Sequence, residues 1–287
     1  MAEADFLAQT LGQTLGQTLA HVERWGAAHA AVAVVGPDGI IATHGPTDFE
    51  LRIASVSKPL VAMAILVAAE EGILALDDPA GPRGSTVRHL LSHASGYGFS
   101  GPTVLAAPGS RRIYSNGGFD DLGALLSAAG GMSAAVYLRE AVFAPLGMAA
   151  SELRGSPAKD VWSTVADLTR FARELLRPTL LAPATMSELT TVQFPTLAGV
   201  LPDVGRFDPN PWGLGVEIRG AKRPHWTGTG NSASTFGHYG GSGTFLWVDP
   251  DADLALVCLT DRAFGPWALE AWPALSDAVL SVGTVAG

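Results

Sequence analysis

Ser55 and Lys58 are the first residues of this 287-residue chain whose types and spacing suggest chemistry. They form a Ser-x-x-Lys pair where an extended run, residues 50–54, meets an apolar segment that begins at Pro59. Residues three positions apart share a helix face, and a lysine amine kept partly neutral by burial can accept a serine proton. The positive end of the helix favours an oxyanion beside the serine. The pair predicts an activated serine nucleophile; an ordinary helix start is the alternative.

A second Ser-x-x-Lys pair, Ser156 and Lys159, lacks this context. It is flanked by Gly155 and Asp160, and no apolar helix follows it directly. Because proline is favoured at the first position of a helix, Ser156-Pro157 predicts a helix cap rather than a nucleophile.

Two downstream motifs could complete a site around Ser55. Tyr114-Ser-Asn116 is a Tyr-x-Asn motif in a chain with only 4 tyrosines, and in an extended segment its two outer side chains point the same way. The phenol can relay a proton, and the amide can orient a polar group. His238-Tyr-Gly240-Gly241 adds an imidazole and two glycines that allow substrate close to the backbone. The alternatives are a turn for Tyr114–Asn116 and a hydrogen-bonded strand histidine for His238.

These residues must be positioned by a sheet and the helices around it. Apolar spacing predicts a terminal helix over residues 3–25, and a Pro-Asp-Gly turn predicts a hairpin of residues 30–35 and 40–44. Near the other end, the pattern predicts three strands at 235–239, 243–248 and 254–259, and a helix over 266–282. Strands at both ends with helices between them indicate one sheet closed by the two chain ends.

The middle of the chain is predicted to be helical. Helices are expected at 59–71, 86–92, 120–129, 132–143 and 164–176, whereas 194–212 and 220–234 resist assignment. No linker divides the chain, so we expect one domain in which a helical lobe is inserted into an α/β lobe. The α/β lobe would comprise residues 1–75 and 210–287, and the helical lobe residues 76–209.

Composition narrows the classes of function. Hydrophobic residues make up 47% of the chain and charged residues 16%, which excludes disorder over most of its length. A net charge of −9 disfavours nucleic acid as a partner. The single cysteine, Cys258, excludes an intramolecular disulfide. The start of the chain resembles no export signal and its longest apolar run, residues 60–69, is too short to cross a membrane, so a cytoplasmic protein is expected. The scattered histidines suggest no metal, and no cofactor is implied. The oligomeric state is not predicted.

The order Ser-x-x-Lys, Tyr-x-Asn and His-x-Gly resembles the serine β-lactamase and penicillin-binding-protein-like superfamily. It is most similar to the class C-type branch, with related carboxylesterases and D-Ala-D-Ala carboxypeptidases. The likeness extends over about residues 30–280, through blocks at 53–59, 86–96, 113–119, 145–148, 163–168, 212–215 and 236–244.

The resemblance implies a β-lactamase/transpeptidase-like α+β fold, in which an antiparallel sheet is flanked by helices and carries an inserted helical lobe. It also implies a role for each motif residue. Ser55 would be the acylated nucleophile, Lys58 its proton acceptor and Tyr114 a general acid or base. Asn116 and His238 would bind substrate beside Gly240, and the backbone N–H groups of Ser55 and Gly241 would form the oxyanion hole.

His238 is a departure, because many β-lactamases have a lysine there, and histidine is mostly uncharged near neutral pH. The resemblance therefore implies a serine hydrolase that uses an acyl-enzyme, with small carboxylic esters as the expected substrates. The alternatives are a D-amino-acid peptidase or amidase, a weak β-lactamase, an acyltransferase and a non-catalytic binder. Two further hypotheses are that acidification through the histidine range lowers activity, and that Trp226, in the loop 219–234, borders the substrate entrance.

Overall fold

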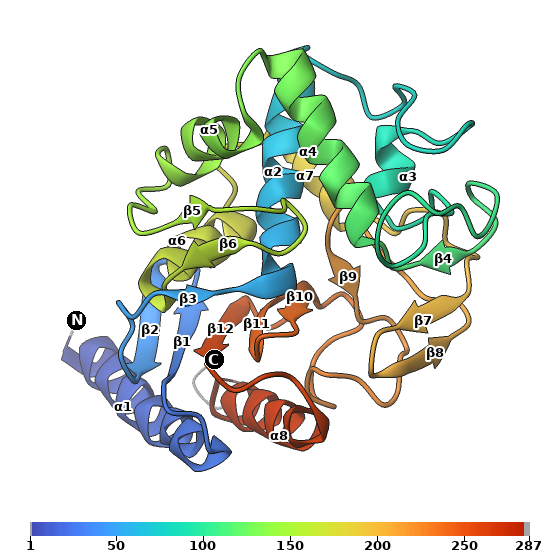
Figure 1. Ribbon diagram of the computed structural model, residues 1–287. Helices are drawn as coiled ribbons and strands as arrows, with labels where there is room; N and C mark the ends of the chain where they lie inside the picture. The colour runs from blue at the N-terminus through green and yellow to red at the C-terminus, as the bar shows by residue number, and fades with distance from the viewer. Residues whose placement is uncertain (1, 284–287) are drawn as a thin grey trace.

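The computed structural model describes residues 2–283, and its centre is a six-stranded antiparallel sheet (Figure 1). The strand order is β2 (Gly39–His44), β1 (Ala30–Gly36), β12 (Leu254–Thr260), β11 (Thr244–Asp249), β10 (Phe236–Gly240) and β9 (Glu217–Ile218). β1 pairs with β12, so the N-terminal hairpin joins the C-terminal strands in one sheet. This confirms the predicted fold class, because strands from both ends of the chain close the sheet.

Alternating side chains on β1 divide the interior into two layers. Val32 and Val34 face the layer below helices α1 (Ala2–Leu19) and α8 (Pro266–Gly283), which lie side by side in Figure 1. Ala31, Ala33 and Val35 face the opposite layer, under α2 (Ser57–Glu70) and α6 (Val165–Leu176). Because successive side chains of a strand point to opposite faces, apolar residues at every position predict a sheet covered on both sides.

Helix α2 crosses the centre of the molecule and sets the position of the site at its first turn (Figure 1). Its side chains are apolar on nearly every face, and all residues from Ser57 to Leu66 are buried. A helix that is hydrophobic all round has to be enclosed by other elements. It packs on β10 below, and against α4 (Asn116–Gly130) and α5 (Ala134–Leu138) above. The first turn of α2 therefore lies where the sheet meets the helices.

The remaining helices lie mostly where the sequence predicts them. They are α3 (Val87–Leu91), α4, α5, the π-helical turn η3 (Arg139–Phe143) and α6. α4 starts four residues earlier than expected because Ser115 caps it by accepting the Gly118 N–H at 3.1 Å. α7 (Pro183–Thr190) was not predicted. α6, which falls within the residues expected to form the helical lobe, packs on β1 and β12 of the sheet.

Two small three-stranded sheets were not predicted. One has the order β3 (Leu51–Arg52), β6 (Val161–Ser163) and β5 (Glu152–Leu153). The other has the order β4 (Arg112–Ile113), β7 (Gly199–Leu201) and β8 (Gly205–Phe207), and it occupies part of the first unassigned stretch. Strands of two or three residues are too short to show an alternating pattern, which explains the omission.

Between residues 2 and 283, no single helix is long and apolar enough to cross a membrane. α4 and the following segment, Ala134–Phe143, have the combined length and composition, but they meet at 86°. Their apolar side chains, including Phe119, Leu122, Leu138 and Phe143, are buried in the core, so packing accounts for their composition.

Candidate active site

Ser55 lies in a single 3₁₀ turn, η2 (Ala54–Val56), between β3 and α2. The preceding Ala54 has φ of 47°, in the left-handed region that side chains rarely adopt. Two contacts hold this turn: the Ser57 hydroxyl donates to the Ala54 carbonyl at 2.6 Å, and the Thr244 hydroxyl donates to the Ile53 carbonyl at 2.8 Å. Backbone strain held by surrounding contacts is common where a reactive side chain is presented. Ser55 is half-buried, and its position at the start of α2 confirms the predicted placement.

Lys58 is fully buried one turn along, with its amine against Ser55. Its Nζ lies 3.3 Å from Ser55 Oγ, 2.7 Å from Asn116 Oδ1 and 2.9 Å from the Ala158 carbonyl oxygen. A neutral amine has two N–H bonds and one lone pair. When the amine is neutral, donating its two N–H bonds to the acceptors of Asn116 and Ala158 leaves its lone pair for the serine hydroxyl, whereas the protonated amine donates to all three oxygens. This arrangement suits removal of the Ser55 proton.

The electrostatic surroundings of Lys58 favour this neutral form. Burial lowers the pKa of Lys58 well below its ordinary value, and the nearby charge of Lys159 lowers it further, whereas Asp120 opposes both. Because burial is the largest of these causes, the amine is available as a base at a pH where an exposed lysine is protonated.

Tyr114 lies two residues before the start of α4, and its side chain reaches Ser55 and Lys58. Burial raises the pKa of its phenol, and a hydrogen bond with Ser55 opposes that shift. The ring packs on Trp212 and His93, with centroids 5.8 Å and 4.4 Å away, and Lys58 Nζ lies 4.7 Å from the ring centroid. The phenol therefore keeps its proton and can donate it, which suits a proton relay.

His238 is the hydrogen-bonding partner of Tyr114 on the sheet side. Its Nδ1–H donates to the Tyr239 carbonyl at 2.7 Å, so the unprotonated Nε2 faces the Tyr114 hydroxyl at 3.4 Å. Burial, together with the charge of Lys58, lowers the pKa of His238 to about 3. A fall in activity on acidification through the ordinary histidine range is therefore not expected from His238, because a fully buried imidazole with this pKa stays neutral there.

The pH dependence of kcat/KM should consequently show Lys58 and not His238. A group with a lowered pKa is deprotonated above that pKa, so activity should rise with pH as Lys58 loses its proton. An ordinary histidine titrates between about pH 5 and 8. His238→Asn should change the rate but should not move the midpoint of the rise that we assign to Lys58. A titration in that range that disappears in His238→Asn would contradict the account.

The remaining predicted residues border the reacting atoms in different ways. Asn116 Oδ1 accepts a hydrogen bond from Lys58 Nζ, so Asn116 directly contacts the expected base. At Gly240, an added Cβ would lie 2.5 Å from the Ile53 carbonyl oxygen; the missing side chain thus allows β10 to approach the serine turn. Gly241 faces open space, and its N–H has no acceptor among the described residues. The Ser55 N–H opens a helix and is likewise free to bind an oxyanion.

Two contributors escaped the sequence analysis, and one hypothesis was wrong. The Ala158 carbonyl comes from the second Ser-x-x-Lys segment, which forms a turn: Ser156 donates to Asp120, and Lys159 is exposed. His93 packs against Tyr114 and accepts the Ser115 N–H at 3.1 Å. Trp226 does not border an entrance, because only 1% of it is exposed and its Nε1 donates to Glu217.

Comparisons with known proteins agree with this fold. The sequence pattern of the family described as Beta-lactamase matches residues 20–280. A β-lactamase from Mycobacterium bovis has a crystal structure with 54% identity and a TM-score of 0.92, over 93% of this chain and 99% of that one. EstCE1, a hydrolase with promiscuous acyltransferase activity, has the same fold at 19% identity and a TM-score of 0.77, over 96% and 99% of the two chains.

A curated relative is penicillin-binding protein 4* of Bacillus subtilis (strain 168). It is 30% identical over an alignment of 138 positions, which covers 36% of this chain and 30% of that protein. The match therefore spans less than a third of the relative's length.

A buried amine beside a serine at the start of a helix, with a phenol near both, fits the class of serine hydrolases. The family match covers most of the chain, and the chain belongs to the Beta-lactamase family.

Proposed function

We propose that the protein is a carboxylesterase that hydrolyses small esters through an acyl-enzyme on Ser55. The observation that carries the proposal is the Lys58 amine, fully buried and 3.3 Å from the Ser55 hydroxyl, with both of its N–H bonds occupied. Such an amine can accept a proton without first losing one to solvent.

The proposed reaction has two balanced halves. The Ser55 proton passes to Lys58 while Oγ attacks the ester carbonyl, and the backbone N–H groups of Ser55 and Gly241 stabilise the oxyanion. The alcohol leaves with a proton delivered by Tyr114, which regains one from Lys58. Water then attacks the acyl-enzyme, gives up its proton through the same groups, and releases the carboxylic acid and Ser55.

The neutral state of His238 favours an ester over a β-lactam. A β-lactam carries a carboxylate, and in many β-lactamases a lysine at this position supplies the matching charge. Here the imidazole is held neutral by burial, with a pKa of about 3. A β-lactamase activity remains the second candidate because the relative from Mycobacterium bovis bears that description. A cytoplasmic location stays a prediction from the sequence.

The test compares substrates on the same protein preparation. We expect kcat/KM for p-nitrophenyl acetate to exceed that for a chromogenic cephalosporin and for a D-Ala-D-Ala peptide. Ser55→Ala should remove all three activities, whereas Ser156→Ala, the serine of the second Ser-x-x-Lys segment, should keep them. A preference for the cephalosporin or the peptide would replace the esterase proposal with the corresponding alternative.

A further inference from the structure

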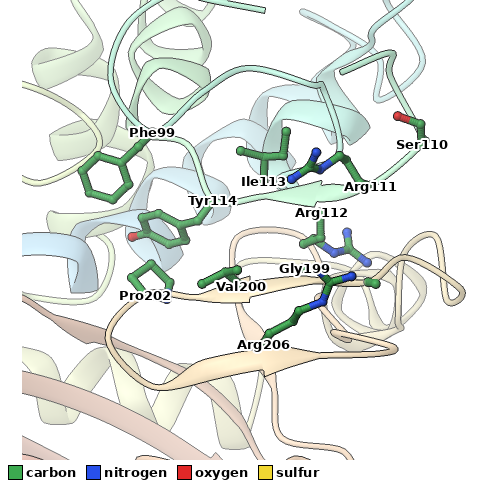
Figure 2. A pocket seen from close by; sticks show the side chains of 11 residues that line it. Phe99, Ser110, Arg111, Arg112, Ile113, Tyr114, Gly199, Val200, Pro202 and Arg206 are labelled. Atoms are coloured by element: carbon green, nitrogen blue, oxygen red, sulfur yellow. The ribbon is translucent and has the colours of Figure 1, made fainter. Parts of the chain in front are cut away.

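A pocket of about 580 Å³ opens on the Tyr114 side of the site (Figure 2). Its walls come from the loop before α4 and from the small sheet of β4, β7 and β8. Tyr114 lies at one end, and Arg111 and Arg206 also line it. None of the proton transfers described above uses either arginine.

The register of the small sheet places both arginines on one face. Ile113 on β4 is opposite Val200 on β7, and Val200 is opposite Arg206 on β8. Arg111 precedes Ile113 by two residues, so the alternation of an extended strand puts it on the same face. Arg112 between them points the other way, and its buried guanidinium donates to backbone carbonyls, including Ser92 at 2.5 Å.

The two pocket arginines are free to bind a ligand. Across residues 2–283, neither Arg111 nor Arg206 makes an ion pair or side-chain hydrogen bond with another described residue, and both are exposed. By contrast, Arg88, Arg154 and Arg177 each bind carboxylates. In a chain with a net charge of −9, two unpaired guanidinium groups facing one pocket form a local cationic site.

Apolar side chains separate this cationic site from the reacting groups. Val200, which is 55% exposed, and Ile113 lie between Tyr114 and the two arginines, whereas Phe99, also 55% exposed, lies beside Tyr114 at the other end (Figure 2). Exposed apolar surface beside a reactive centre suits the carbon skeleton of a substrate. The pocket therefore offers a proton donor at one end, an apolar middle, and two cations.

The position of Tyr114 indicates which part of the substrate enters. Its phenol gives a proton to the departing oxygen, so the alcohol portion of the ester leaves on that side. We propose that this pocket binds the alcohol portion of an ester whose far end carries a carboxylate or phosphate, recognised by Arg111 and Arg206. The inference rests on the proposed esterase function and names its substrate class.

The test uses acetate esters of phenols that differ only at the far end. In the charged esters, the 4-acetoxyphenyl ring carries a chain of one to three methylene groups that ends in a carboxylate. They are compared with the corresponding primary amides, which have the same shape without the charge. At the best chain length, we expect the carboxylate to have a kcat/KM about tenfold above the amide. Arg111→Gln and Arg206→Gln should each reduce that preference, chiefly by raising KM for the carboxylate ester. Added salt should weaken the preference.

Controls separate the outcomes. Arg83→Gln, an exposed arginine that does not line the pocket, should keep the preference. Esters ending in a phosphate show which anion is preferred. Equal Ser55-dependent turnover of all charged esters and the amide, unchanged in both arginine variants, would overturn the anion site alone. Absence of Ser55-dependent turnover of any ester would overturn the esterase function and this inference with it.

Discussion

Lys58→Arg is expected to lower kcat/KM for p-nitrophenyl acetate by about 10²–10⁴-fold, the usual contribution of a general base. The substitution replaces the neutral base with a permanent cation, because a guanidinium does not lose its proton in this pH range. In the wild type, burial lowers the pKa of Lys58, and Asn116 and Ala158 hold its N–H bonds. An arginine fork cannot present a lone pair to Ser55.

Two further variants separate loss of the base from loss of the fold. Lys58→Met removes the amine with little change of volume and should be as inactive as the arginine variant, with cooperative thermal unfolding retained. Lys159→Arg makes the same exchange at the exposed lysine of the second Ser-x-x-Lys segment and should be fully active. An active Lys58→Arg would refute the role of Lys58 as proton acceptor.

Tyr114→Phe is expected to reduce kcat/KM by about 10²-fold or more for esters with a poor leaving group. The phenol is the proton donor beside Ser55, and burial raises its pKa, so it carries the proton that an alkoxide needs on departure. A p-nitrophenolate leaves without protonation. The loss should therefore be smaller for p-nitrophenyl acetate than for an alkyl acetate.

The matched control is Tyr97→Phe. Tyr97 is also buried, but its hydroxyl donates to Asp121 at 2.8 Å, away from Ser55. Removing that hydroxyl should leave the ratio between the two kinds of ester unchanged. If Tyr114→Phe slowed both kinds equally, Tyr114 would act on the attack of the serine and not on departure of the alcohol.

The sequence predicted those parts of the fold that repeat a pattern over enough residues. The hairpin of β1 and β2 and the run from β10 to β12 were found because β1 and β12 are almost continuously apolar and turn residues separate neighbouring strands. The small sheet of β4, β7 and β8 was missed because its strands have two or three residues and one pairing is parallel. Its position depends on contacts between distant segments, which a local pattern does not contain.

In the active site, too, some features could be predicted from the sequence and others depend on the fold. Ser55, Lys58 and Tyr114 were predicted from residue types and order, and the structure brings them together. The Ala158 carbonyl could not be predicted, because every residue has one and only the fold selects it. The lowered pKa of His238 and the burial of Trp226 were missed for a related reason, since burial follows from packing of the whole chain.

The most direct test of the account is the intact mass of the protein quenched during turnover of p-nitrophenyl acetate. We predict a species heavier by one acetyl group, with the modification on the peptide that contains Ser55, and with none in Ser55→Ala. The same species should be absent from Lys58→Arg, where attack does not occur. Turnover in Ser55→Ala, or an acetyl group on another residue that forms and decays at the catalytic rate, would contradict the Ser55 acyl-enzyme.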